Sequence, residues 1–135
     1  MLKDNYKFNT KEGIFLVYKI DLKEKTLLIT MGGFFTPDEA KSFIDDYEKT
    51  VSSMDTKGIS LILDGSELKA STQDMLPMLQ QCMEMYMRDN FKKVIVLDFD
   101  SSVTNSQITR VAKSIGFDQR YQMVATLDEA LKAAL

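Results

Sequence analysis

The most informative segment of the chain reads Ile59-Ser-Leu-Ile-Leu-Asp-Gly-Ser-Glu-Leu-Lys-Ala-Ser-Thr-Gln-Asp-Met-Leu76. Its first part, 59–63, is an apolar run with the length of a strand, which is typical of a strand buried on both faces of a sheet. We expect Asp64 to end this strand, after which small polar residues precede an apolar helical pattern. The segment therefore predicts hydroxyl and amide groups at a helix N-terminus. In α/β proteins sites are generally built at such strand-to-helix connections.

Two runs rich in β-branched and aromatic residues precede this segment, at 14–20 and 26–31, and they predict an antiparallel hairpin. Before them, 1–13 is a polar lead-in segment that we expect to be strand-like or a loose arm. Two later apolar runs, 93–99 and 121–125, predict further strands.

Three patterns of a threonine followed three residues later by Glu or Gln predict helix starts. They are Thr36 with Glu39, Thr104 with Gln107, and Thr126 with Glu129. Gly116 is expected to end the helix that begins after Thr104. The remaining helix contains Pro77, which fits its first turn if Asp74 is the N-cap.

These elements alternate as β-β-α-β-α-β-α-β-α, which predicts the α/β class. We expect a mixed sheet of about five strands, with the N-terminal hairpin followed by parallel strands, and four helices. The length of 135 residues suits a single domain spanning 1–135.

The composition argues against several kinds of partner. A net charge of −3, with basic residues scattered along the chain, gives no basic patch for nucleic acid. No apolar run is long enough to span a membrane, and the N-terminus lacks the apolar core of a signal peptide. Cys82 is the only cysteine, so we expect a protein of the reducing cytoplasm.

The chain contains no histidine, and so lacks the commonest general base and metal ligand. We therefore predict a protein that is not an enzyme, with no catalytic residue, metal or cofactor. One alternative stays open. Asp64, Asp98 and Asp100 each lie at the end of a predicted strand and would form a carboxylate cluster for a divalent cation or for acid–base work if they met.

Hydrophobic residues cover an unusually wide arc of the helix that ends near Arg88. Neighbouring elements would cover the excess, or else Met78 and Met85 belong to an adaptable apolar surface for a partner, a second copy of the chain or an apolar ligand. Phe34 and Phe35, before the first helix, are predicted to fill the core at that corner, with an exposed aromatic lip as the alternative.

The pattern resembles the STAS superfamily, and within it the SpoIIAA-like (STAS/SEC14-type) branch of small bacterial proteins. The resemblance lies in four segments: Gly33-Phe-Phe-Thr-Pro-Asp-Glu-Ala40, Leu61-Ile-Leu-Asp-Gly-Ser-Glu-Leu-Lys69, Ile108-Thr-Arg-Val-Ala-Lys-Ser-Ile-Gly116 and Leu127-Asp-Glu-Ala-Leu131. Signalling members of this family bind protein partners, and a kinase phosphorylates the serine of an Asp-Ser pair that opens a helix. Here that stretch reads Thr72-Gln73-Asp74, so Gln73 stands near the position of that serine.

The resemblance implies a non-enzymatic regulatory protein that binds a partner through the loop and helix start around 65–75. The candidate contact or phosphorylation residues are Ser66, Ser71, Thr72, Gln73 and Asp74, with Met78 and Met85 as the apolar part of the surface. The expected partner is another protein or a second copy of the chain. The alternative is a small-molecule or lipid-binding domain whose Met-rich helix lines an apolar cavity.

Overall fold

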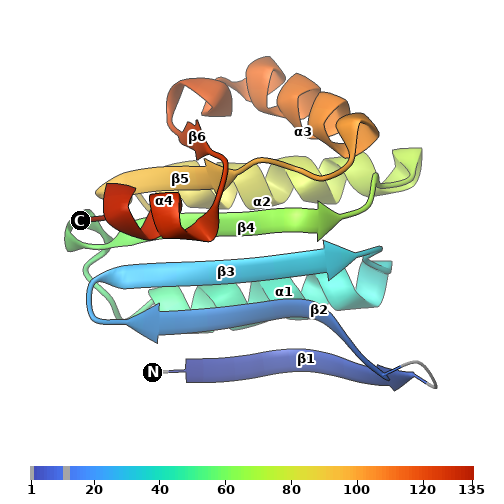
Figure 1. Cartoon of the computed structure of the whole chain (residues 1–135), viewed down its shortest axis with the longest axis horizontal. Helices are drawn as coiled ribbons and strands as arrows, with labels where there is room; N and C mark the ends of the chain where they lie inside the picture. The colour runs from blue at the N-terminus through green and yellow to red at the C-terminus, as the bar shows by residue number, and fades with distance from the viewer. Residues whose placement is uncertain (1, 11–12) are drawn as a thin grey trace.

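The computed structural model describes the backbone of residues 2–10 and 13–135 and the side chains from residue 18 onward. Within these residues one sheet has six strands in chain order, with β1 to β3 antiparallel and β3 to β6 parallel (Figure 1). The strands are β1 (Leu2–Thr10), β2 (Gly13–Lys23), β3 (Thr26–Gly33), β4 (Ser60–Leu68), β5 (Lys93–Leu97) and β6 (Gln122–Val124). The predicted mixed sheet is confirmed, and the lead-in segment adds a strand to it.

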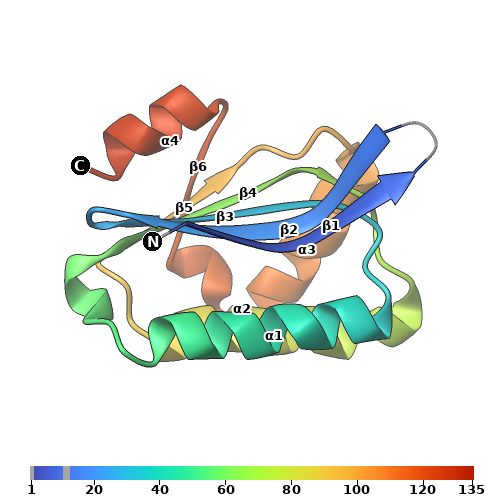
Figure 2. The same cartoon turned by 90° about the horizontal axis from the view of Figure 1, so that it is seen from below.

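Four helices cover the two faces of the sheet unequally (Figure 2). They are α1 (Pro37–Val51), α2 (Leu76–Arg88), α3 (Ser102–Ile115) and α4 (Leu127–Ala133). The helices α1 to α3 pack on one face, and the short α4 packs on the other. In β4, Leu61 points to the first face and Ile62 to the second, and both are fully buried. The prediction of a strand buried on both sides is therefore confirmed.

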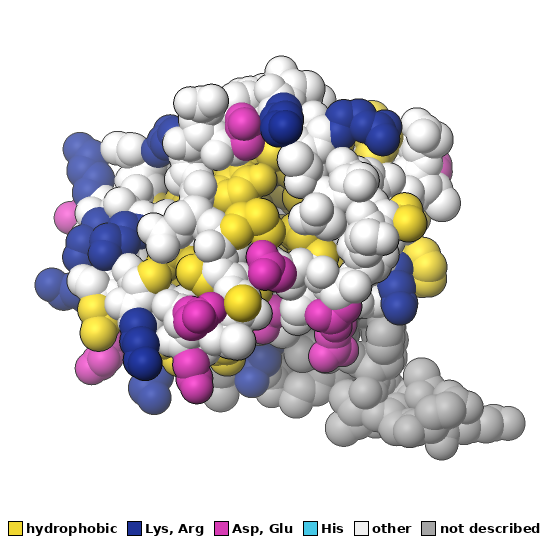
Figure 3. All heavy atoms as spheres, turned by 45° about the horizontal axis from the view of Figure 1, so that its top comes forward, with side chains coloured by type: hydrophobic (Ala, Val, Ile, Leu, Met, Phe, Trp, Pro, Cys, Tyr) yellow, Lys and Arg dark blue, Asp and Glu magenta, His cyan; other side chains and the backbone are white. Residues whose placement is uncertain are grey.

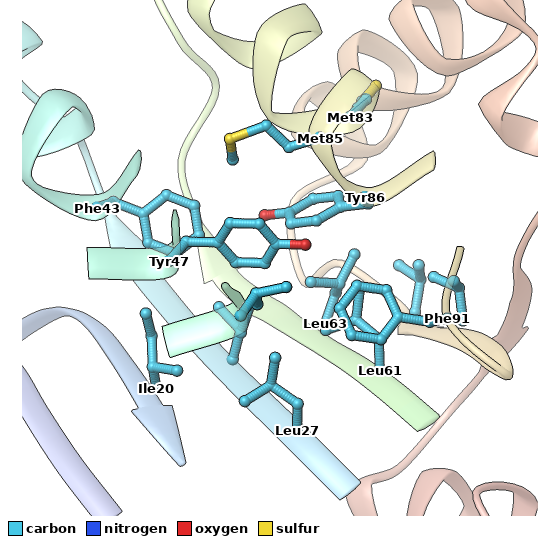
Figure 4. Packing of buried hydrophobic residues seen from close by; sticks show 14 of the residues in the cluster. Ile20, Leu27, Phe43, Tyr47, Leu61, Leu63, Met83, Met85, Tyr86 and Phe91 are labelled. Carbon is cyan, nitrogen blue, oxygen red and sulfur yellow. The ribbon is translucent and has the colours of Figure 1, made fainter. Parts of the chain in front are cut away.

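The larger core lies between the sheet and the helices α1 and α2 (Figure 4). Aromatic rings connect the layers. Tyr47 of α1 packs edge-on against Tyr86 of α2, with ring centroids 5.5 Å apart. The Tyr47 hydroxyl also donates to Oδ2 of Asp89 at 2.8 Å, at the C-terminal end of α2. These contacts fix the position of α2 against α1.

Two of the three predicted capping boxes are confirmed, at Thr36 and Thr126, and Gly116 ends α3 with a φ of +82°. The prediction of a capping box at Thr104 is wrong, because Ser101 is the N-cap and its hydroxyl accepts from the Thr104 N–H at 3.2 Å. Helix α3 therefore begins earlier than predicted, and Thr104 and Gln107 are free to contact another part of the chain.

The strand β4 is longer than predicted, because after a bulge Glu67 and Leu68 pair with Gly32 and Gly33 of β3. Asp64 therefore does not end the strand. Its carboxylate instead accepts from the Ser66 N–H at 3.2 Å and from the Ser66 hydroxyl at 2.8 Å.

The start of α2 also differs from the prediction. A short 3-10 turn, η2 (Gln73–Met75), precedes α2, so Asp74 lies in this turn and is not the N-cap. The N-cap is Met75, which makes no side-chain capping bond. Pro77 lies in the first turn of α2, as its missing N–H requires.

Candidate functional site

The parallel strands β3, β4 and β5 lead into α1, α2 and α3 at the same edge of the sheet, on the right in Figure 1. We call 69–75, which connects β4 to α2, the carboxyl-edge segment. It comprises four residues without regular structure followed by the turn η2. This is the place where α/β folds generally carry their sites.

Backbone groups from two neighbouring elements hold the start of the carboxyl-edge segment. The Lys69 N–H donates to the Gly33 carbonyl at 3.0 Å, so β3 supports the segment on one side. On the other side, the hydroxyl of Thr104 in α3 donates to the Leu68 carbonyl at 3.0 Å. The segment is therefore tied to the end of β3 and to the first turn of α3.

Gln107 of α3 holds the middle of the same segment. The Ser71 N–H donates to Oε1 of Gln107 at 2.8 Å, and Nε2 of Gln107 donates to the Ser71 carbonyl at 2.8 Å. The side-chain amide thus replaces the backbone partner that a neighbouring strand would supply. Sequence analysis assigned Gln107 to a helix cap, because the pattern Thr-x-x-Gln gives no sign of this distant contact.

The five predicted contact residues differ in their exposure. Thr72, Gln73 and Asp74 are exposed, and the Thr72 hydroxyl donates to Oδ1 of Asp74 at 2.5 Å. Ser71 is half-buried beside Gln107, and Ser66 is half-buried with its hydroxyl bound to Asp64. The accessible polar groups are therefore those of 72–74.

Two large exposed apolar residues are the sequence neighbours of Gly33 and Thr104, which hold the start of the carboxyl-edge segment. Phe34, directly after the last residue of β3, is 63% exposed, so the prediction that it fills the core is wrong. Only Phe35 turns inward, where its ring centroid lies 6.2 Å from that of Tyr18. Val103, in the first turn of α3, is 65% exposed. Sequence analysis missed Val103, because it placed this residue before the helix.

The prediction of an apolar surface at Met85 is wrong, because Met85 is only 4% exposed. Its side chain lies on the side of α2 that faces Phe43 and Tyr47 of α1 (Figure 4). Met78 is half-buried and lines a cavity. Most of the wide hydrophobic arc of α2 is thus covered by α1, α3 and the sheet.

That cavity has a volume of about 100 Å³ and lies between α2, the sheet and the neighbouring helices. Met75, the N-cap of α2, lies in its wall together with the α2 residues Met78, Leu79, Cys82, Met83 and Tyr86. Leu63 and Val96 line it from the sheet, and Ile108 lines it from α3. The wall is almost entirely apolar.

The predicted alternative of a carboxylate cluster is wrong. Among the side chains described from residue 18 onward, no three His, Cys, Asp or Glu side chains lie close enough to share a metal ion. Asp64 is bound to Ser66, whereas Asp98 and Asp100 are exposed.

Solved structures with the same architecture include SpoIIAA, described as an anti-sigma factor antagonist in its unphosphorylated form. It superposes with a TM-score of 0.60 at 13% sequence identity, over 86% of this chain and 94% of SpoIIAA. This chain has the SpoIIAA fold. An anti-sigma factor antagonist from Mycobacterium paratuberculosis superposes with a TM-score of 0.52 at 16% identity, over 94% of this chain and 98% of that protein. No protein-family model and no curated protein matches the sequence.

The SpoIIAA-like fold also exposes apolar residues away from the carboxyl edge. Met123 of β6 and Leu127 and Leu131 of α4 are each exposed by about two fifths. Figure 3 brings this side of the molecule forward and shows hydrophobic side chains gathered near its middle.

None of the helices in the described part of the chain combines the length and apolarity needed to cross a membrane.

Replacing Gln107 with Ala is expected to destabilise the SpoIIAA-like fold by about 2 kcal/mol, because it leaves two half-buried backbone groups of Ser71 without partners. Urea denaturation measures the loss, and hydrogen exchange at the Ser71 amide is expected to become faster. The matched control is Gln81→Ala in α2, where the side chain is exposed. Equal stability of the two variants would show that the Gln107 contacts do not hold the segment.

Proposed function

We propose that this chain is a non-enzymatic regulatory protein that binds a protein partner through its carboxyl edge. The contact surface consists of the exposed residues Thr72, Gln73 and Asp74 together with Phe34 and Val103. We call these five residues the carboxyl-edge surface. The observation that carries the proposal is the position of Phe34, a large aromatic residue that is 63% exposed and directly follows Gly33, whose carbonyl accepts from the Lys69 N–H at the start of the carboxyl-edge segment.

The physical features of this surface suit protein recognition. Exposed aromatic side chains surrounded by polar groups are typical of the few residues that dominate binding energy at protein interfaces. The segment is also held in place by Gln107 and Thr104, so binding would not have to order a loose loop. The likeness in fold to two anti-sigma factor antagonists supports a role of the same regulatory kind.

Thr72 is the residue of this surface that we propose as the site of phosphorylation. It is exposed, whereas Ser71 is half-buried and both of its backbone groups are bound to Gln107. A phosphate on Thr72 would add nearly two negative charges beside Asp74 and so change the surface without disturbing the core. Gln73, near the position that the family resemblance gives to the serine, cannot be phosphorylated.

A photo-crosslinking amino acid in place of Gln73 tests the proposal in the cells that produce the protein. The expected result is one discrete crosslinked species containing a second, different protein. The control places the same amino acid at Ser53, which is exposed and follows the C-terminal end of α1. Equal crosslinking at both positions, or none at Gln73, would contradict the proposed surface, and a crosslink between two copies of this chain would replace the partner with self-association.

The second candidate function is binding of an apolar small molecule or a lipid chain in the cavity beside α2. The observation that favours it is the apolar wall of this cavity, in which four methionines are able to adapt to a ligand. They are Met31, Met75, Met78 and Met83.

A further inference from the structure

The wall of the cavity is electrically neutral. It contains no Asp, Glu, Lys or Arg side chain. Burial raises the pKa of the Cys82 thiol to about 12, so the thiol is uncharged at pH 7. Since a charge without a partner is very costly to bury, this cavity selects against charged ligands.

The most deeply buried tyrosine of this wall is Tyr86. Tyr86 lines the cavity and is only 4% exposed, and its hydroxyl makes no hydrogen bond to any side chain or backbone group of the described residues. Its oxygen is not fully enclosed, so a bound molecule can reach it. In Figure 4 this hydroxyl points toward α1 and lies beside the ring of Tyr47, beyond which lies Phe43, another residue of the wall.

The Tyr86 side chain is buried, but its hydroxyl oxygen is not fully enclosed and has no partner in the described part of the chain. The large majority of buried side-chain polar atoms have a hydrogen-bond partner. The neighbouring Tyr47 follows this rule, because its hydroxyl donates to Asp89. A ligand with one polar atom would satisfy the Tyr86 hydroxyl, whereas a purely apolar ligand would leave it unsatisfied.

We infer that the cavity binds a small, uncharged, largely apolar molecule with one hydrogen-bonding oxygen or nitrogen, which the Tyr86 hydroxyl holds. This inference rests on the second function proposed above. The volume of about 100 Å³ is smaller than the cavity of about 150 Å³ known to hold benzene. The flexible methionines of the wall allow it to widen to the size of one substituted ring.

Calorimetric titration with p-cresol and with toluene tests the inference, because the two molecules differ by one hydroxyl. The proteins compared are the wild type, Tyr86→Phe and the matched control Tyr47→Phe, which removes a tyrosine hydroxyl of the core that does not line the cavity. Cys82, the single cysteine, also lines the cavity and reports the place of binding. A ligand in the cavity slows modification of Cys82 by a small thiol reagent.

The expected result is that both compounds bind the wild type and protect Cys82. Tyr86→Phe is expected to weaken the binding of p-cresol about tenfold, which is the effect of one buried hydrogen bond. It is expected to leave the affinity for toluene unchanged. Tyr47→Phe is expected to leave both affinities unchanged, because Tyr47 lies outside the wall.

Three other outcomes would overturn the inference in different ways. If p-cresol binds the wild type and Tyr86→Phe equally well, the Tyr86 hydroxyl does not hold the ligand, although the cavity still binds one. If neither compound binds or protects Cys82, the proposal that the cavity binds apolar molecules is wrong as well. Binding of benzoate as tight as that of p-cresol would contradict the selection for uncharged ligands.

Discussion

Replacing Leu61 with Ala is expected to lower the free energy of unfolding by about 3 kcal/mol, which is the largest effect on stability that we predict. Leu61 is fully buried in β4, under the helices α1 and α2. The loss has two causes. The shorter side chain removes less apolar surface from water on folding, and the substitution leaves a cavity in the core. Urea denaturation followed by circular dichroism measures it.

The matched control for this substitution is Leu131→Ala in α4. Leu131 is 43% exposed, so its replacement is expected to change the free energy of unfolding by about 0.5 kcal/mol at most. A loss below about 1 kcal/mol for Leu61→Ala would show that β4 is not the fully buried centre of the sheet.

Replacing Phe34 with Ala is expected to weaken binding of the protein partner by about 2 kcal/mol, or roughly thirtyfold in Kd. The reason is that Phe34 presents the largest exposed apolar side chain of the carboxyl-edge surface. Titration with the partner identified by crosslinking measures the change. Because Phe34 makes little contact with the core, the stability of the variant is expected to stay close to that of the wild type.

The matched control for Phe34→Ala is Leu127→Ala, which removes an exposed apolar side chain of α4 on the other face of the sheet. It is expected to leave partner binding unchanged. A larger effect at Leu127 than at Phe34 would move the binding surface to α4 and β6.

Features of the fold that depend on neighbouring residues in sequence were predictable. The capping boxes at Thr36 and Thr126 and the helix end at Gly116 are complete within a few residues, so no distant contact competes with them. The apolar run of β4 is similarly local, since a strand buried on both faces needs apolar residues on both.

The errors arise where distant contacts decide the structure. Thr104 and Gln107 have the pattern of a capping box, but Leu68 and Ser71 bind their side chains instead. Asp64 does not end β4, because β3 continues to pair with the strand beyond it.

The candidate site was only partly predictable for the same reason. The pattern of α2 indicated excess hydrophobic surface, but periodicity alone cannot show that α1 covers Met85. The exposure of Phe34 and Val103 depends on how the helices α1 and α3 meet the ends of the strands. The polar segment 72–74 was predicted because the position of a strand-to-helix connection follows from the element order.

Hydrogen exchange of the chain, with and without the crosslinked partner, shows whether the carboxyl edge binds that partner. We predict slower exchange on binding in 69–75, around Phe34 and in the first turn of α3, with α4 unchanged. Slower exchange confined to β6 and α4, where Met123 and Leu131 are exposed, would show that the partner binds there and not at the carboxyl edge.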